Sequence, residues 1–159
     1  MNGYNFTDRT RRALHVAGDE AATFKHEYIS TEHILLALLR DRASGAVALL
    51  TTLRSDMHGI RRKIEETVKI GSATTPAGAP RPYTSRAKKV LDLAMVAARE
   101  DGHSSVETQH LLLGLVREEK GIAAQVLAHA GITPGRVTAA LGDARGTDDG
   151  TPGDQARRT

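Results

Sequence analysis

The feature that most restricts the fold of this sequence is an internal duplication. When the chain is slid along itself without a gap, Phe-Thr-Asp-Arg at residues 6–9 falls on Tyr-Thr-Ser-Arg at residues 83–86. The same register aligns His26 with His103 and continues beyond them. Shared apolar periodicity alone would not reproduce such polar positions, so the chain contains two copies of one unit.

Each copy predicts four helices, and no segment shows the alternation of a strand. Thr7 and Thr84 are candidate N-caps, each followed by small apolar residues at helical spacing. Thr31 and Thr108 are also expected to cap their own helices, and each precedes an apolar run that predicts a central, buried helix. Third and fourth helices are expected at about 44–53 and 57–68, and again at about 121–130 and 134–141.

The domain boundaries follow from composition. The first repeat is placed at residues 1–70 and the second at 83–142, and both are expected to form one compact domain. Between them, residues 71–82 are rich in Pro, Gly, Ser and Thr and show no packing signal, which is typical of a linker. Residues 143–159 are rich in Gly, Asp and Thr and are expected to be a disordered tail.

The composition supports an all-α fold and excludes several classes of site. Hydrophobic residues make up 40% of the 159 residues but aromatic residues only 3%, so the core is built from Ala, Leu, Val and Ile. Such a core favours close-packed helices. Without Cys there is no disulfide, thiol nucleophile or Cys-ligated zinc. With no apolar run of the ~20 residues that span a bilayer and no secretory signal at the start, a cytoplasmic protein is expected.

Several motifs together resemble a known family. Ile-Ser-Thr-Glu-His-Ile-Leu-Leu at residues 29–36 and Thr-Gln-His-Leu-Leu-Leu-Gly-Leu at residues 108–115 occur in the same order as in the Clp N-terminal (Clp R) repeat domain. The resemblance covers residues 6–142 and is strongest to the amino-terminal domain of ClpC-type Hsp100 unfoldases. It implies an all-α module of two tandem four-helix repeats with pseudo-twofold symmetry.

The resemblance also implies a function in protein quality control. In the unfoldases this module receives substrates and adaptor proteins ahead of two AAA+ ATPase modules. This sequence has no G-x-x-x-x-G-K-[ST] motif, so we expect a non-enzymatic module without a cofactor. Two roles are open: an accessory that captures marked substrates or adaptors, and a decoy that competes with the unfoldase for ligands. Both a stand-alone protein and a piece of a longer unfoldase agree with the sequence.

ClpC-type domains bind phosphorylated arginine, a degradation mark, at one site in each repeat. Carried over by motif, the first site pairs Thr7 with Glu32, and the second pairs Thr84 with Gln109. A carboxylate suits the planar guanidinium, and a helix amino-terminus suits the phosphoryl group. Gln109 carries no charge, so the second site is expected to lose on the order of 1–2 kcal/mol of charge-assisted bonding.

The first helices of the two repeats imply a second ligand site. By resemblance they form the groove in which ClpC-type domains bind macrocyclic peptide antibiotics. The corresponding residues here include Arg11, Tyr83 and Lys88.

The remaining polar residues of note are four histidines and three basic clusters. His26, His33, His103 and His110 are expected to be structural, because they lack the convergent ligand spacing of a metal site. No nucleophile motif is present, so no catalytic residue is predicted. The alternative function is nucleic-acid binding, which the sparse aromatic residues and nearly balanced charge disfavour. It would rest on three basic clusters: Arg9/Arg11/Arg12, Arg61/Arg62/Lys63 and Arg86/Lys88/Lys89.

Overall fold

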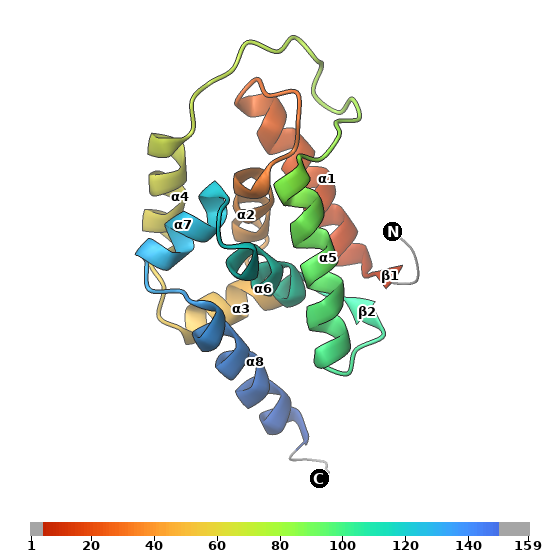
Figure 1. Cartoon of the computed structure of the whole chain (residues 1–159), viewed down its shortest axis with the longest axis vertical. Coiled ribbons are helices and arrows are strands. Elements are labelled where there is room, and N and C mark those ends of the chain that lie inside the picture. Colours follow the sequence, from red (N-terminus) through yellow and green to blue (C-terminus); the bar gives the residue numbers. More distant parts are fainter. Residues whose placement is uncertain (1–4, 150–159) are drawn as a thin grey trace.

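A computed structural model describes residues 5–149 of the chain, and in these residues helices dominate (Figure 1). The first repeat contains β1 (Asn5–Phe6), α1 (Asp8–Thr23), α2 (Thr31–Arg40), α3 (Gly45–Thr52) and α4 (Met57–Thr67). The second contains α5 (Ser85–Glu100), β2 (Ser105–Val106), α6 (Thr108–Glu118), α7 (Ile122–His129) and α8 (Pro134–Asp149). The prediction of an all-α fold with two four-helix repeats is confirmed.

The first helix of each repeat begins where its capping threonine predicts. The Thr7 hydroxyl accepts a hydrogen bond from the Thr10 amide, and the Thr84 hydroxyl accepts one from the Ala87 amide, both at 3.2 Å. Each bond satisfies an amide that has no partner within its own helix. Local sequence thus sets the start of α1 and α5.

The core lies around α2 and α6, which occupy the centre of the molecule (Figure 1). Both helices are apolar on nearly all sides and buried along most of their length. Leu35, Leu36, Leu112 and Leu113, the predicted core residues, are at most 2% exposed. Helices without a polar face need neighbours all round, and the remaining helices supply them.

Two very short strands, which the sequence did not predict, join the repeats. β1 pairs in parallel with β2, with Phe6 opposite Val106, and a single bridge links Ile29 to Tyr83. Two residues are too few to show the alternation that identifies a strand. In both places the segment before the first helix of one repeat pairs with the segment before the second helix of the other.

The two motif threonines do not cap their own helices, which corrects the sequence-based expectation. The N-cap of α2 is Ser30 and that of α6 is Glu107. Instead, the Thr31 hydroxyl accepts a hydrogen bond from the Ala123 amide at 3.3 Å, at the start of α7. The Thr108 hydroxyl accepts one from the Ala46 amide at 3.1 Å, at the start of α3. Each repeat therefore caps the third helix of the other, and we call these two bonds the crossed caps.

The segment between the repeats packs against the first repeat, contrary to the expectation of a linker without packing. Arg81 is 8% exposed and donates hydrogen bonds to four backbone carbonyls, including that of His26 at 2.9 Å. The Gly71 amide bonds to the Phe24 carbonyl at 2.7 Å. Residues 71–82 thus form an ordered strap over the loop between α1 and α2 (Figure 1).

The end of the second repeat also differs from its expected boundary. α8 continues beyond 142 to Asp149, so residues 143–149 are helical where a disordered tail was expected. The remainder of that predicted tail, residues 150–159, lies outside the described residues. Among the helices of residues 5–149, none combines the length and apolarity needed to cross a bilayer.

Candidate functional site

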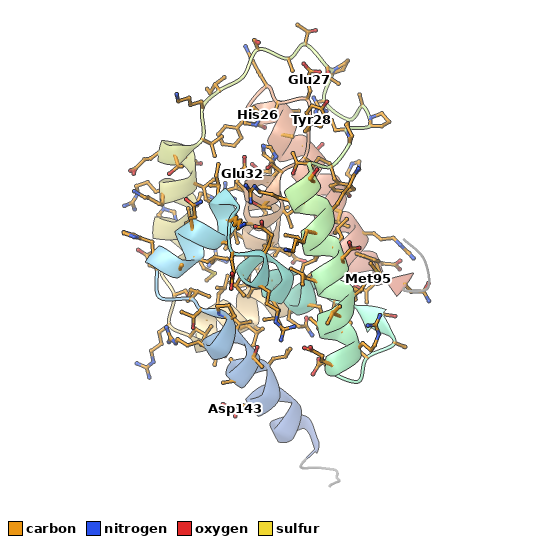
Figure 2. All side chains as sticks on the ribbon, viewed as in Figure 1. His26, Glu27, Tyr28, Glu32, Met95 and Asp143 are labelled. Atoms are coloured by element: carbon orange, nitrogen blue, oxygen red, sulfur yellow. The ribbon has the colours of Figure 1, made fainter. Side chains whose placement is uncertain are left out.

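A cavity of about 360 Å³ opens where the α1–α2 loop, the start of α2, the strap and the start of α5 meet. It is lined by side chains from all four segments, among them Lys25, Glu32, Ser72 and Thr84. Figure 2 shows His26, Glu27 and Tyr28 at the end of the molecule that the strap covers, with Glu32 close by. We call this space the Glu32 cavity.

Glu32 is the unusual residue of this cavity. The side chain lies in the first turn of α2 and the residue is only 6% exposed. Its Oε1 atom is buried and has no hydrogen-bond partner. A buried carboxylate oxygen without a donor is costly, because no protein group replaces its lost hydration. Glu32 therefore keeps one acceptor atom that the described residues leave unused.

A chain of hydrogen bonds fixes the two histidines beside Glu32. The Ser30 amide donates to Nδ1 of His33 at 2.9 Å, so the proton of neutral His33 is on Nε2. That nitrogen faces Nδ1 of His26 at 2.8 Å, and Nε2 of His26 faces the Lys69 carbonyl at 2.7 Å. Burial, followed by the charges of His26 and Arg81, lowers the pKa of His33 to about 3. His33 is therefore neutral at physiological pH.

The structure brings carboxylates close to both histidine pairs, which the sequence did not predict. The ligand atoms of His26, Glu32 and His33 lie within 4.8 Å of one another, as do those of Asp101, His103 and His110. In the first cluster all four ring nitrogens already take part in the hydrogen-bond chain. A metal ion at this cluster would have to break that chain, which favours the structural role expected for the histidines.

The second repeat replaces this arrangement with carboxylates that already have partners. Glu107 stands where the first repeat has Ser30, and its Oε1 accepts a hydrogen bond from Nε2 of Gln109 at 3.0 Å. Its Oε2 atom lies 2.8 Å from Nδ1 of His103. The acid of this site is thus at the N-cap of α6, whereas Glu32 is the second residue of α2, and both oxygens of Glu107 already have partners.

A further carboxylate, Asp101, occupies the position equivalent to Phe24. Its Oδ2 accepts a hydrogen bond from Nε2 of His110 at 2.9 Å and lies 3.2 Å from Nε2 of His103. Burial lowers the pKa of His110, and the hydrogen bond that His110 donates to Asp101 opposes that shift. Phe24 instead stacks on His26, with ring centroids 5.8 Å apart. The two repeats therefore have the same order of helices but different polar interiors.

Of the predicted ligand residues, the structure brings Glu32 together with Thr84. Thr84, not Thr7, lines the cavity with Glu32. Thr7 is the N-cap of α1, and its amide donates a hydrogen bond to the Val106 carbonyl at 3.1 Å. Val106 lies just before α6, the helix that carries Gln109. Because the repeats pack crosswise, the cavity combines Glu32 with Thr84 instead of the expected Thr7. A site formed by a threonine and Gln109 stays a prediction.

The three residues of the predicted peptide groove have different surroundings. Arg11 makes an ion pair of 3.2 Å with Asp8 of its own helix. Tyr83 is half-buried against the core, and this burial raises its pKa. Lys88 is exposed. A groove that joins these three residues stays a prediction.

Four of the nine residues in the basic clusters, Arg9, Arg11, Arg61 and Arg86, contact acids or carbonyls. Arg9 contacts Asp41 at 3.3 Å, Arg86 contacts the buried carboxylate of Glu118 at 3.2 Å, and Arg61 donates to the Leu36 carbonyl at 3.3 Å. These contacts neutralise or hold several of the charges that a nucleic-acid interface would need.

Sequence reasoning missed three residues of the two sites. Lys25 lines the Glu32 cavity, Arg81 orders its strap, and Glu107 fills the second site. The register between the repeats does contain a signal for Lys25 and Glu107, because Gly102 and Ser30 stand at the equivalent positions. The contacts of Arg81 depend on the path of the strap, which the repeat pattern does not determine.

Comparison with known proteins agrees with the fold. The family model of the Clp repeat (R) N-terminal domain matches residues 5–98 and 82–156. The chaperone protein ClpB of Oceanobacillus iheyensis is 36% identical over 96% of this chain and 18% of its own length. The negative regulator of genetic competence ClpC/MecB of Bacillus subtilis is 41% identical over 80% of this chain and 15% of its own length. This chain thus spans less than a fifth of either relative.

Solved structures share the architecture at lower sequence identity. The Hsp104 N-terminal domain from Candida albicans superposes with a TM-score of 0.73 at 20% identity, over 91% of this chain and 93% of that one. A ClpV N-domain in complex with a VipB peptide gives a TM-score of 0.71 at 16% identity, over 87% and 88%. Together, the family match, the two relatives and the repeat architecture show that this chain belongs to the Clp repeat (R) N-terminal domain family.

Proposed function

We propose that this chain is a cytoplasmic, non-enzymatic binding module of a Clp protease system, and that it captures proteins or peptides through the Glu32 cavity. The observation that carries the proposal is the buried, unpartnered Oε1 of Glu32 in an open cavity of about 360 Å³. The cost of burying that oxygen is already present in the free protein. A ligand that brings an N–H donor removes this cost and gains binding free energy from it.

The lining of the cavity supports a side chain of a protein as the ligand. Tyr28, which lines the cavity, is 54% exposed and offers apolar area to the chain that carries the bound side chain. The ClpV N-domain in complex with a VipB peptide has the same fold, which supports peptides as a ligand class. Accordingly, adaptor proteins and substrate proteins are the partners we propose.

The specific ligand we propose is phosphorylated arginine. A guanidinium would satisfy the free oxygen of Glu32 by a charge-assisted hydrogen bond, and Thr84 with the start of α5 would face the phosphoryl group. Gln109 lacks the charge and already bonds to Glu107. We therefore expect one dominant site per chain.

Titration calorimetry with free phosphoarginine tests this function. The unmodified chain should bind with a stoichiometry near one, and Glu32→Gln, which copies the residue of the second repeat, should remove most of the heat. Gln109→Glu alone would place a second carboxylate beside Glu107, so the gain of a second site requires Glu107→Ser together with Gln109→Glu. Two equal sites in the unmodified chain would contradict the proposal.

We also propose that the chain binds antibiotics and that it acts either as an accessory or as a decoy. Arg11, Tyr83 and Lys88 are proposed to contact macrocyclic peptide antibiotics, which suits a decoy as well as an accessory role. Co-purification of Clp subunits from a lysate would favour the accessory role, and antibiotic protection without such co-purification would favour the decoy. Because the sequence has no phosphate-binding loop, purified protein should not hydrolyse ATP in a coupled assay.

A further inference from the structure

Lys25 is the one lysine among the residues that line the Glu32 cavity. It follows the end of α1, in the loop that leads to α2, and it is exposed. The second repeat has Gly102 at the equivalent position. The first ligand site therefore has a lysine among its lining residues, whereas the second repeat has a glycine at the equivalent position.

The backbone at Lys25 is suited to glycine rather than lysine. Its φ angle is 57°, in the left-handed region, and Gly102 has a φ of 75°. A non-glycine residue here costs free energy because its Cβ approaches the backbone. Arg54 shows the same replacement, with a φ of 58° opposite Gly131. Lys25 differs from Arg54 in its location, because only Lys25 lines the Glu32 cavity.

The cavity then presents opposite charges to one ligand. Glu32 is buried and has an unpartnered oxygen, whereas Lys25 and the acid Glu27, which also line the cavity, are exposed. Thr84, the N-cap of α5, lines the cavity as well and adds the positive end of a helix dipole. This arrangement matches a ligand with a cationic group that enters first and an anionic group that follows it.

We propose that Lys25 is the anion-binding residue of the Glu32 cavity, and that it makes the cavity select a guanidinium that bears an anionic group over an unmodified guanidinium. The inference rests on the proposed function, since it names a residue that determines specificity at the same site. It also gives a second reason for unequal sites, because the second repeat lacks both the free acid and the lysine.

Competitive or direct titration with two probes, phosphoarginine and L-arginine, tests the inference. Lys25→Asn removes the charge but keeps a residue that tolerates a left-handed backbone, so the fold is preserved. We expect Lys25→Asn to weaken phosphoarginine binding about tenfold, as the loss of one exposed charge-assisted hydrogen bond implies, and to leave arginine binding unchanged. Lys25→Arg should restore most of the affinity for phosphoarginine.

A matched control separates a local contact from general electrostatics. Lys63 is an exposed lysine of α4, and Lys63→Asn makes the same change in net charge away from the cavity. An equal loss of affinity in Lys63→Asn would overturn the inference. If Lys25→Asn binds phosphoarginine like the unmodified chain while Glu32→Gln does not bind, the inference fails and the proposed function stands. If the unmodified chain does not bind phosphoarginine at all, both fail.

Discussion

At the residue scale, His33 shows how burial controls a charge. The residue is 1% exposed, and its ring is held between the Ser30 amide and His26. Its folded pKa of about 3 lies below the ordinary value of 6.5. As the pH falls below 6.5, the unfolded chain binds a proton that the folded chain does not. The contribution of neutral His33 to stability is therefore complete above pH 6.5 and is lost as the pH falls toward 3.

This difference predicts a pH-dependent stability. Between pH 6 and pH 4, His33 should lower the free energy of unfolding by up to about 1.4 kcal/mol for each pH unit. In His33→Gln, which keeps a polar side chain at this capping-box position, that part of the slope should be missing. Urea unfolding at several pH values measures both slopes, and identical slopes would show that His33 is not the responsible group.

A second residue-scale prediction concerns the core. Leu36 is fully buried in the central helix α2. Leu36→Ala removes apolar contacts and leaves a cavity, which should cost about 2–5 kcal/mol of unfolding free energy. Val96, which is 36% exposed, provides the comparison, because Val96→Ala should cost much less. Equal losses in thermal or urea unfolding would mean that α2 is not the centre of the core.

The candidate site was only partly predictable from its residues. Glu32 and Thr84 were identified through motifs, because carboxylate, hydroxyl and helix start are visible in the sequence. Which threonine faces Glu32 depends on how the two repeats pack, and no local pattern contains that information. The unpartnered state of the Glu32 oxygen is likewise a property of the assembled fold.

At the element scale, helix positions were predictable because their signals are local. The expected first helices agree with α1 and α5, and both third helices lie within their expected ranges. The length of α8 was underestimated, since residues 142–149 are rich in Gly and Asp, which weaken the helical pattern. The strands and the crossed caps were missed because each joins residues far apart in the sequence.

The crossed caps predict a specific loss of stability. Thr31→Val and Thr108→Val keep the shape of the side chain but remove the hydroxyl that accepts from the Ala123 or Ala46 amide. Each change should cost about 1 kcal/mol, the usual value of an N-cap. Thr52→Val, at an exposed hydroxyl on α3, should change the unfolding free energy far less. An unchanged urea midpoint in both buried variants would contradict the role of the crossed caps.

At the scale of the whole molecule, neither repeat is complete alone. α3 packs on α6 and α8 of the second repeat, and α7 packs on α2 and α4 of the first. The strand pairs and crossed caps add bonds in both directions. A single repeat would expose the apolar faces and unpaired amides that these contacts cover.

Separated halves test this interdependence. Residues 1–82 alone should show no cooperative thermal transition, and the same is expected for residues 83–159. When the two pieces are mixed, helical circular dichroism and a cooperative transition should return, because the contacts between repeats are the same in the mixture. A cooperative transition in either isolated piece would show that a repeat is an independent folding unit.

The strap of residues 71–82 has a consequence for assembly. Every contact between the repeats can form equally well with the complementary repeat of another chain, since the bonds do not depend on chain connectivity. What favours closure within one chain is the high local concentration that the strap maintains. A strap too short to join the two repeats would therefore favour a domain-swapped dimer, in which each Glu32 cavity takes its Thr84 from the other chain.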